Sequence, residues 1–386
     1  MRCWAACLVQ LLLIGSVALS QDVSAPVQHV SRTLAVTGPR FELSAERPQA
    51  QIWKITQPRA AGPETHTWQL LATLPGTILH DISFPTATIG YAAGEHGQIW
   101  KTTNGGKNWL QVLSAGDNYY FYGVATLSAS KVVISGFYDS PTAQFGVFRW
   151  SYDGGRSWTS DLSFGSATLL RVRFVKGQDG IIMEEGGGNS PTSTEFTTDG
   201  GATLPGWSSV VSNPDGGWFD PQFSLLANLH ARASGIDFCT SVTGGAQWTC
   251  NPSVDSIFDG PVFFLNNSRG WVGGGEISPN VEGWIHLTTN GGENWTTRTL
   301  DGPWPIRSVL FLTGQIGWAA GGNFYTGVGG IYSSADGGNT WSVDATTNSE
   351  MGSCAQHAIS GGHQLWCAGF NGNPQSYSSV IYSTQF

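Results

Sequence analysis

An eight-residue pattern recurs six times along this chain of 386 residues, with successive copies 44 to 49 residues apart. It reads Ser/Thr-x-Asp/Asn-x-Gly-x-x-Trp in its commonest form. The third positions of the six copies are Asn104, Asp153, Asp199, Thr243, Asn290 and Asp336. A fixed period of this length indicates that one supersecondary unit is repeated, as in propellers and solenoids.

The chemistry of the pattern predicts a tight turn. An Asp or Asn side chain at the third position can accept hydrogen bonds from backbone N–H groups two residues on, and the glycines tolerate positive φ. An extended stretch precedes each copy and a Trp-containing strand follows it, which together describe a β-hairpin. Thr243 replaces the acid in one copy and Leu204 replaces the Trp in another, yet the spacing is kept. We therefore interpret the six turn positions as structural, with the Trp rings buried against neighbouring sheets.

Two further strands precede each hairpin. Gly-flanked strands of small residues, such as Gly90–Gly94 and Gly317–Gly322, lie upstream of the turns. Apolar strands such as Leu79–Phe84 and Ile306–Leu312 lie upstream of these. Small side chains suit the crowded inner strands of a propeller. Four strands in about 46 residues match one propeller blade.

The end of the repeat predicts how the ring closes. A seventh unit stops at Phe386, where its turn motif is missing. The stretch His66–Ala72 carries Thr67-Trp68, like the Thr-Trp ending of the sixth copy, and can supply the absent outer strand. The sequence therefore predicts an all-β fold over residues 64–386. We expect a seven-bladed β-propeller of four-stranded antiparallel blades, with the last blade closed by an N-terminal strand.

The first 20 residues have the features of a secretory signal peptide. Arg2 gives a positive start, Leu11–Leu19 is the apolar core, and small residues precede a cleavage site at Gln21. Residues 21–63 fit the repeat less well and contain one candidate extra strand, Gln51–Thr56. We expect a secreted protein, extracellular or in the lumen of the secretory pathway. No later apolar run is long enough to predict a membrane span.

Four cysteines remain once the leader is removed, and an even number in an oxidising compartment predicts disulfides. Cys239 and Cys250 flank the fourth turn motif, and Cys354 and Cys367 bracket the first two strands of the last blade. We therefore predict the pairs Cys239–Cys250 and Cys354–Cys367. Neither pair has the spacing of metal ligands, so we expect no metal and no cofactor.

Charge and sequons bear on partners and modification. The motif Asn-x-Ser/Thr predicts glycosylation at Asn266 and Asn294. The net charge is -9, and the Lys and Arg residues form no cluster. These features argue against nucleic acid or an anionic membrane as a partner. We expect a monomer.

In a propeller, the starts of the innermost strands surround the mouth of the central channel. Aligning those strands on Ile82 and its counterparts places seven polar residues near this rim: His80, Asp81, Tyr122, Arg171, Asp259, Arg307 and His357. This mixture can bind a polar or acidic ligand through charge-assisted hydrogen bonds. The alternative is that strand starts in a water-filled channel are simply polar.

The stretch Gly90–Trp109 resembles the repeat of the photosystem II assembly and stability factor family of β-propellers. It also resembles the Asp-box, or bacterial neuraminidase, repeat of the sialidases. Both resemblances imply the propeller fold over roughly residues 66–386. They are less specific for function, because Asp boxes occur in many unrelated proteins.

We expect a secreted, non-catalytic binding module with a glycan or protein ligand at the channel mouth. The alternative is an extracellular glycoside hydrolase of the sialidase-like type. The sialidase signature Phe/Tyr-Arg-Ile-Pro is absent before the first turn motif. A glycosidase needs two carboxylates about 5–10 Å apart in an open cleft. Asp81 and Asp259 are the pair that tests this alternative.

Overall fold

The computed structural model describes residues 66–164, 168–176, 179–185, 193–197, 199–200, 206–209, 222–226, 228–233, 237–241, 249–252, 261–276, 282–302, 304–323, 326–371 and 377–386. All of these belong to one compact unit, Gly62–Phe386. The predicted signal peptide, the segment 21–63, Thr243 and Asp259 lie outside the described residues. No helix in the described part is long and apolar enough to cross a membrane.

The described strands form four-stranded antiparallel sheets that follow one another along the chain. The first sheet contains β2 (Leu79–Ser83), β3 (Gly90–Gly94), β4 (Gln98–Thr102) and β5 (Leu110–Ser114). The second contains β6 (Tyr119–Thr126), β7 (Val132–Asp139), β8 (Gln144–Ser151) and β9 (Leu162–Phe164). The third contains β10 (Thr168–Lys176), β11 (Asp179–Glu185), β12 (Ser193–Thr197) and β13 (Gly206–Ser209).

Three further sheets repeat this order. The fourth contains β14 (Gln222–Leu226), β15 (Asn228–Ala233), β16 (Asp237–Ser241) and β17 (Thr249–Pro252). The fifth contains β18 (Val262–Phe264), β19 (Gly270–Glu276), β20 (Glu282–Thr288) and β21 (Thr296–Thr299). The sixth contains β22 (Ile306–Phe311), β23 (Gly317–Asn323), β24 (Val328–Ser334) and β25 (Ser342–Thr347).

The seventh sheet combines the two ends of the described chain. It contains β26 (Glu350–Ile359), β27 (Gly362–Asn371) and β28 (Ser378–Gln385), and its fourth strand is β1 (Gln69–Pro75). β1 pairs antiparallel with β28, so that Thr73 lies opposite Val380. The N-terminal strand therefore supplies the outer strand that the missing seventh turn motif predicts. It starts at Gln69, three residues later than the predicted stretch.

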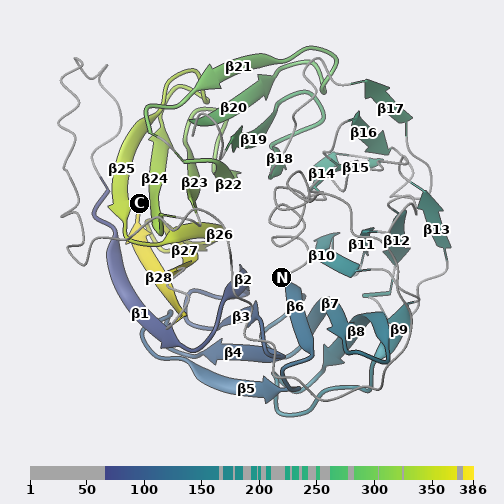
Figure 1. Cartoon of the computed structure of the whole chain (residues 1–386). Coiled ribbons are helices and arrows are strands. Elements are labelled where there is room, and N and C mark those ends of the chain that lie inside the picture. The colour runs from purple at the N-terminus through teal and green to yellow at the C-terminus, as the bar shows by residue number, and fades with distance from the viewer. Residues whose placement is uncertain are drawn as a thin grey trace, which may run out of the picture. The chain divides into compact units, whose positions relative to one another are not determined.

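Successive sheets touch one another through their first strands. β2 contacts β6, β6 contacts β10, and the same relation continues through β14, β18, β22 and β26. β26 in turn contacts β2. Figure 1 shows these first strands on the inner side of their sheets and the fourth strands, such as β5 and β21, on the outer side.

The glycines that start the second strands have a specific steric cause. A Cβ on Gly90 would collide with the ring of Phe84, and a Cβ on Gly317 would collide with the ring of Phe311. Each Phe follows or ends the first strand of its own sheet. The Gly at the start of the second strand is therefore required by an aromatic ring that lies over it.

The turn motif closes through two side chains. Asp153 Oδ1 accepts hydrogen bonds from Ser151 Oγ at 2.9 Å and from the backbone N–H of Ser157 at 2.9 Å. Ser151 Oγ accepts the backbone N–H of Gly155 at 2.7 Å. The bonded N–H groups thus lie four residues after each acceptor, rather than two residues on as we expected. Gly154 and Gly155 have φ of 74° and 88°, which suits glycine.

These hydrogen bonds also explain the acidity of the turn carboxylate. The side chain and backbone of Ser157 lower the pKa of Asp153 to about 2. The same contacts recur around Asn104, Asn290 and Asp336. The turn oxygens are occupied by their own loop, as a structural role requires.

Tryptophans of the second strands form hydrogen bonds between neighbouring sheets. Trp366 of the seventh sheet donates from Nε1 to the carbonyl of Gly105 in the first sheet at 2.9 Å, and its ring stacks on Phe84 at 3.7 Å. Trp271 of the fifth sheet bonds Gly337 of the sixth sheet in the same way at 3.0 Å. The Trp of the turn motif is only half-buried; Trp109 bonds Gly106 of its own turn. Trp109 nevertheless packs against the apolar cluster formed by Phe84 of the first sheet and Trp366, Ala368 and Ile381 of the seventh, so the expectation that the motif Trp packs between sheets is confirmed for Trp109.

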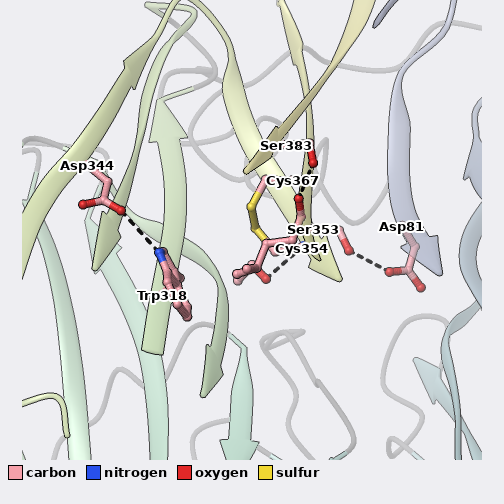
Figure 2. Close-up of a disulfide and its surroundings, with 9 residues drawn as sticks. Asp81, Trp318, Asp344, Ser353, Cys354, Cys367 and Ser383 are labelled. Atoms are coloured by element: carbon pink, nitrogen blue, oxygen red, sulfur yellow. Dashed lines mark hydrogen bonds between the residues drawn. A yellow bond between two sulfur atoms is a disulfide. The ribbon is translucent and has the colours of Figure 1, made fainter. Parts of the chain in front are cut away.

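The predicted disulfide between Cys354 and Cys367 is present and joins β26 to β27 (Figure 2). Cys239 also lies directly opposite Cys250 in the ladder between β16 and β17. The side chains of this second pair lie outside the described residues, so the Cys239–Cys250 bond stays a prediction.

Candidate functional site

A β-bulge interrupts the first strand at one repeated place. The register shifts around His80 in β2, Tyr122 in β6, Leu170 in β10, Arg307 in β22 and Gly352 in β26. A bulge leaves one residue unpaired and re-aims its side chain. Three predicted rim residues, His80, Tyr122 and Arg307, therefore occupy the same position in their sheets.

The other predicted rim residues fall elsewhere. Asp81 and Arg171 each follow the bulged residue, but the side chain of Arg171 lies outside the described ones. His357 lies five residues after the bulged Gly352 and opposite Gln364, toward the other end of β26. The counterpart of Ile82 in β26 is thus Cys354, not Ile359. The register of β26 therefore does not place His357 level with the rim residues of the other first strands. β26 is longer than the aligned apolar stretch, and this is why Ile359 was taken as the counterpart of Ile82.

Asp81 connects four sheets. The carboxylate is 1% exposed and lies on β2. Oδ2 accepts the backbone N–H of Val124 on β6 at 3.0 Å and Arg173 Nη1 on β10 at 2.9 Å. Oδ1 accepts Ser353 Oγ on β26 at 2.8 Å (Figure 2). A buried carboxylate is stable when it is paired and hydrogen-bonded. Asp81 therefore acts as an anchor between first strands.

His80 forms a second buried group. Its Nε2 lies 3.5 Å from Glu95 Oε1, and its ring packs against Tyr122 with centroids 4.8 Å apart. Glu95 lies just after β3, in the connection to β4. Burial opposes ionisation of Glu95, but the hydrogen bond and charge of His80 hold the pKa of this carboxyl below its usual value. The two side chains form an ion pair when the His80 imidazole is protonated.

Arg307 and Glu350 form a third group, between the sixth and seventh sheets. Arg307 Nε donates to Glu350 Oε1 at 3.2 Å. The side chain of Glu350 is 0% exposed, and its second oxygen, Oε2, has no hydrogen-bond partner. Burial raises the pKa of Glu350 to about 8, against the attraction of Arg307. Burial thus disfavours the ionised form of Glu350, whereas the Arg307 guanidinium favours it.

We call these residues the inner-strand cluster: His80, Asp81, Glu95, Tyr122, Arg173, Arg307 and Glu350. The structure shows two guanidinium groups held by buried carboxyl groups while parts of them remain exposed; the Arg173 side chain is 29% exposed. Such groups can bind carboxylates through charge-assisted hydrogen bonds. Among the described residues, no three His, Cys, Asp or Glu side chains are grouped to hold a metal.

Three members of the cluster were not predicted from the sequence. Glu95 lies in a connection, and Glu350 begins a strand before the aligned apolar residues. Arg173 lies two positions beyond the predicted Arg171. Their pairing partners are on other strands or sheets, which a strand-by-strand alignment does not reveal. The alternating stretch Leu170–Phe174 in β10 did offer a signal for Arg173, because residues two apart in a strand lie on the same face and Arg171 was already predicted.

The two sequons lie in connections between strands. Asn266 Oδ1 accepts the backbone N–H groups of Ser268 and Arg269 in the turn between β18 and β19. Asn294 is exposed in the turn between β20 and β21, beside the half-buried Trp295. Glycosylation at both sites stays a prediction.

No protein-family model matches the chain, and no curated protein matches it. Solved structures do resemble it. YCF48 bound to D1 peptide is 18% identical with a TM-score of 0.59, over 83% of this chain and 97% of that one. The WD40 β-propeller domain of Doa1 is 12% identical with a TM-score of 0.56, over 82% and 97%.

A third similar structure belongs to an enzyme. The GH74 xyloglucanase from Xanthomonas campestris is 17% identical with a TM-score of 0.53, over 80% of this chain and 54% of that one. Identities this low are evidence for the fold alone. The chain therefore has an all-β propeller fold, and its resemblance to photosystem II assembly factors holds at the level of the fold.

Proposed function

We propose that the protein is a secreted, non-catalytic binding module, built as a closed seven-bladed propeller. The ligand is an acidic peptide segment of a partner protein, bound at the inner-strand cluster. The cycle of contacts between first strands supports the closed ring. So does the repetition of the Trp271–Gly337 contact by Trp366 and Gly105 where the seventh sheet meets the first.

The observation that carries this proposal is the burial of the three carboxyl groups and the partners that they contact. Asp81 accepts three hydrogen bonds and faces Arg173, Glu95 faces His80, and Glu350 faces Arg307. All three are at least nine-tenths buried. They orient cations rather than offering themselves to a substrate. The site is therefore suited to hold an anionic group.

Glycoside hydrolysis is the competing function, and the xyloglucanase shares the fold. It requires an acid and a second carboxylate on either side of a sugar in an open cleft. Asp81 is closed off by donors from three other sheets, so it cannot take either role without breaking the contacts between them. Asp259, the other member of the pair that tests this alternative, lies outside the described residues.

A peptide is favoured over an acidic glycan by one external observation. YCF48 binds a peptide, and it has the same fold. Tyr122 is buried within the cluster, so the guanidinium of Arg173, whose side chain is 29% exposed, is the group that remains open to an acidic side chain of such a peptide.

The test is a binding screen with the secreted full-length protein. We expect binding to a subset of acidic peptides on an array, and none to glycans that carry carboxylate groups. The double variant Arg307→Gln/Glu350→Gln removes the cation without leaving a buried charge, and should weaken binding about tenfold. Arg156→Gln is the control, because Arg156 is exposed on the turn between β8 and β9. Equal binding by both variants, or binding to acidic glycans alone, would refute the proposal.

A further inference from the structure

A groove lies at the opposite ends of the strands from the inner-strand cluster. His80 lies at the start of β2, whereas Ala87 and Thr88 lie in the turn after its end. Asn104, Gly105 and Lys107 belong to the turn motif between β4 and β5. Because consecutive strands are antiparallel, these two turns share one edge of the first sheet.

The seventh sheet forms the other wall. His66 and Thr67 lie just before β1, and Gln69 and Leu71 lie at its start; Ser383, Thr384 and Gln385 end β28, and Phe386 follows them. Ile359 at the end of β26 and Gln364 near the start of β27 complete the lining. The volume is about 960 Å³, within the range of ligand sites in proteins. The groove thus lies where the first and seventh sheets meet.

The missing seventh turn motif explains why space remains there. In the first, second, fifth and sixth sheets, a turn motif joins the third and fourth strands at this edge. In the seventh sheet, β28 and β1 are adjacent without being joined by such a turn. The groove opens beside this edge, where no turn motif joins β28 to β1. It is a consequence of how the chain closes the sheet.

The lining is rich in neutral hydrogen-bonding groups. Gln364 Nε2 donates to Ser383 Oγ and to the carbonyl of Thr384, and Gln385 Nε2 donates to Gln364 Oε1. These contacts hold the amides of one wall in place. No Asp or Glu is among the described residues that line the groove, and Lys107 is its one Lys or Arg. Its chemistry is therefore that of amides and hydroxyls.

The other wall presents an oriented amide. Asn104 Oδ1 accepts Thr102 Oγ1 at 3.0 Å and the backbone N–H of Asn108 at 2.9 Å. Because the oxygen is bound within the turn, the Nδ2 amino group is directed away from these contacts, and the residue is exposed. The second and sixth sheets carry Asp153 and Asp336 at this position. The turn that borders the groove carries the neutral amide instead.

An aromatic ring supplies the apolar part of the lining. Phe386 is 39% exposed, and its ring meets those of Trp318 and His66 at centroid distances of 5.4 and 5.3 Å. His66 is held by Asp344 at 3.1 Å. Phe386 is therefore a fixed platform with an open side. Sugar rings pair an apolar C–H face with a rim of hydroxyls, each of which can donate and accept.

We propose that this groove binds a neutral oligosaccharide. Phe386 packs against a sugar C–H face, and the amides of Asn104, Gln364 and Gln385 bind the hydroxyls. Amides match hydroxyls because both groups donate and accept. No carboxylate is among the described residues of the lining, so the proposal is one of binding alone. It is independent of the inner-strand cluster.

The test uses the full-length protein and defined probes. Cellohexaose, mannohexaose, xylohexaose and maltohexaose represent neutral chains, and hexagalacturonate represents an acidic one. Binding is followed by calorimetry and by saturation-transfer NMR. We expect at least one neutral hexasaccharide to bind, with Phe386→Ala weakening it about tenfold.

The turn motif provides a matched pair of variants. Asn104→Asp keeps the turn, because Asp occupies the same position in other sheets, but it replaces the donor Nδ2 by a carboxylate oxygen. Asn290→Asp makes the same change in a turn that does not line the groove. We expect about tenfold weaker binding for Asn104→Asp and no change for Asn290→Asp.

Three outcomes would overturn this proposal: no neutral hexasaccharide binds, only hexagalacturonate or acidic peptides bind, or the two Asn variants behave alike. The Arg307→Gln/Glu350→Gln variant should bind the hexasaccharide normally. If no neutral hexasaccharide binds, the acidic-peptide proposal is unaffected. If no acidic peptide binds, the hexasaccharide proposal is unaffected.

Discussion

Arg173 on β10 donates a hydrogen bond to Asp81 on β2 at 2.9 Å, although the second sheet separates the two strands in sequence. The same carboxylate bonds Val124 on β6 and Ser353 on β26. One side chain therefore links the seventh, first, second and third sheets. The contact is between first strands, where the sheets come closest.

Replacing Asp81 should destabilise the whole unit. Asp81→Ala removes three hydrogen bonds and leaves Arg173 without this anion, so we expect a loss of about 3–5 kcal/mol in the free energy of unfolding. Chemical denaturation measures it. Asp117→Ala is the control, because the Asp117 side chain is 93% exposed. A loss at Asp81 no larger than at Asp117 would contradict the anchoring role.

Glu350 should make stability depend on pH. Burial raises its pKa from 4.5 to about 8, so the folded state binds more protons than the unfolded state between these values. The contribution of this group to stability is complete below pH 4.5 and is lost as the pH rises through about 8. Glu350→Gln should remove this slope, as measured by urea unfolding at several pH values. The exposed Glu282→Gln variant should retain it; equal slopes in the two variants would disprove the assignment.

Trp366 should contribute more to stability than the Trp of the first turn motif. It is 0% exposed and joins the seventh sheet to the first through Gly105 and Phe84. Trp366→Ala should cost about 3–5 kcal/mol. Trp109→Ala should cost less, because Trp109 is half-buried and bonds its own turn. Thermal and urea unfolding measure the stability of both variants. A larger loss for Trp109→Ala than for Trp366→Ala would contradict the role of Trp366 in joining the seventh sheet to the first.

The disulfides can be tested by peptide mapping without reduction. We expect peptides linked through Cys354 and Cys367, and also through Cys239 and Cys250, whose backbones occupy the same directly opposed register. Replacing both Cys354 and Cys367 by Ala should lower stability by about 2–4 kcal/mol. Free thiols at Cys239 and Cys250 in the unreduced protein would disprove the second pair.

Much of the strand order follows from local chemistry. The turn motif predicts the hairpin in each sheet, and the missing seventh copy predicts that β1 joins β28. These features depend on residues close in sequence, or on counting a period. Such features can be recognised in a single sequence because the residues of each turn bond one another. Asp153, for example, bonds Ser151 and Ser157 of its own turn.

The inner-strand cluster was only partly predictable, because its pairs cross between sheets. A β-bulge shifts the register by one residue. Gly352, an isolated glycine within β26, marks the position of this bulge, but an alignment on the apolar Ile359 passes over it. His357 was misaligned for that reason. Glu350 was missed because an acidic residue at a strand start is ordinarily solvated; its burial depends on Arg307 from the neighbouring sheet.

The pairing of β1 with β28 sets a constraint on biosynthesis. Leu79 and Ser379, which hydrogen-bond next to this seam, are 300 residues apart. β1 leaves the ribosome long before its partner exists, so its edge stays unpaired while the intervening sheets are made. Contacts this distant in sequence form late and slowly. The outer strand of the seventh sheet is therefore the segment that a chaperone would need to shield until translation reaches β28.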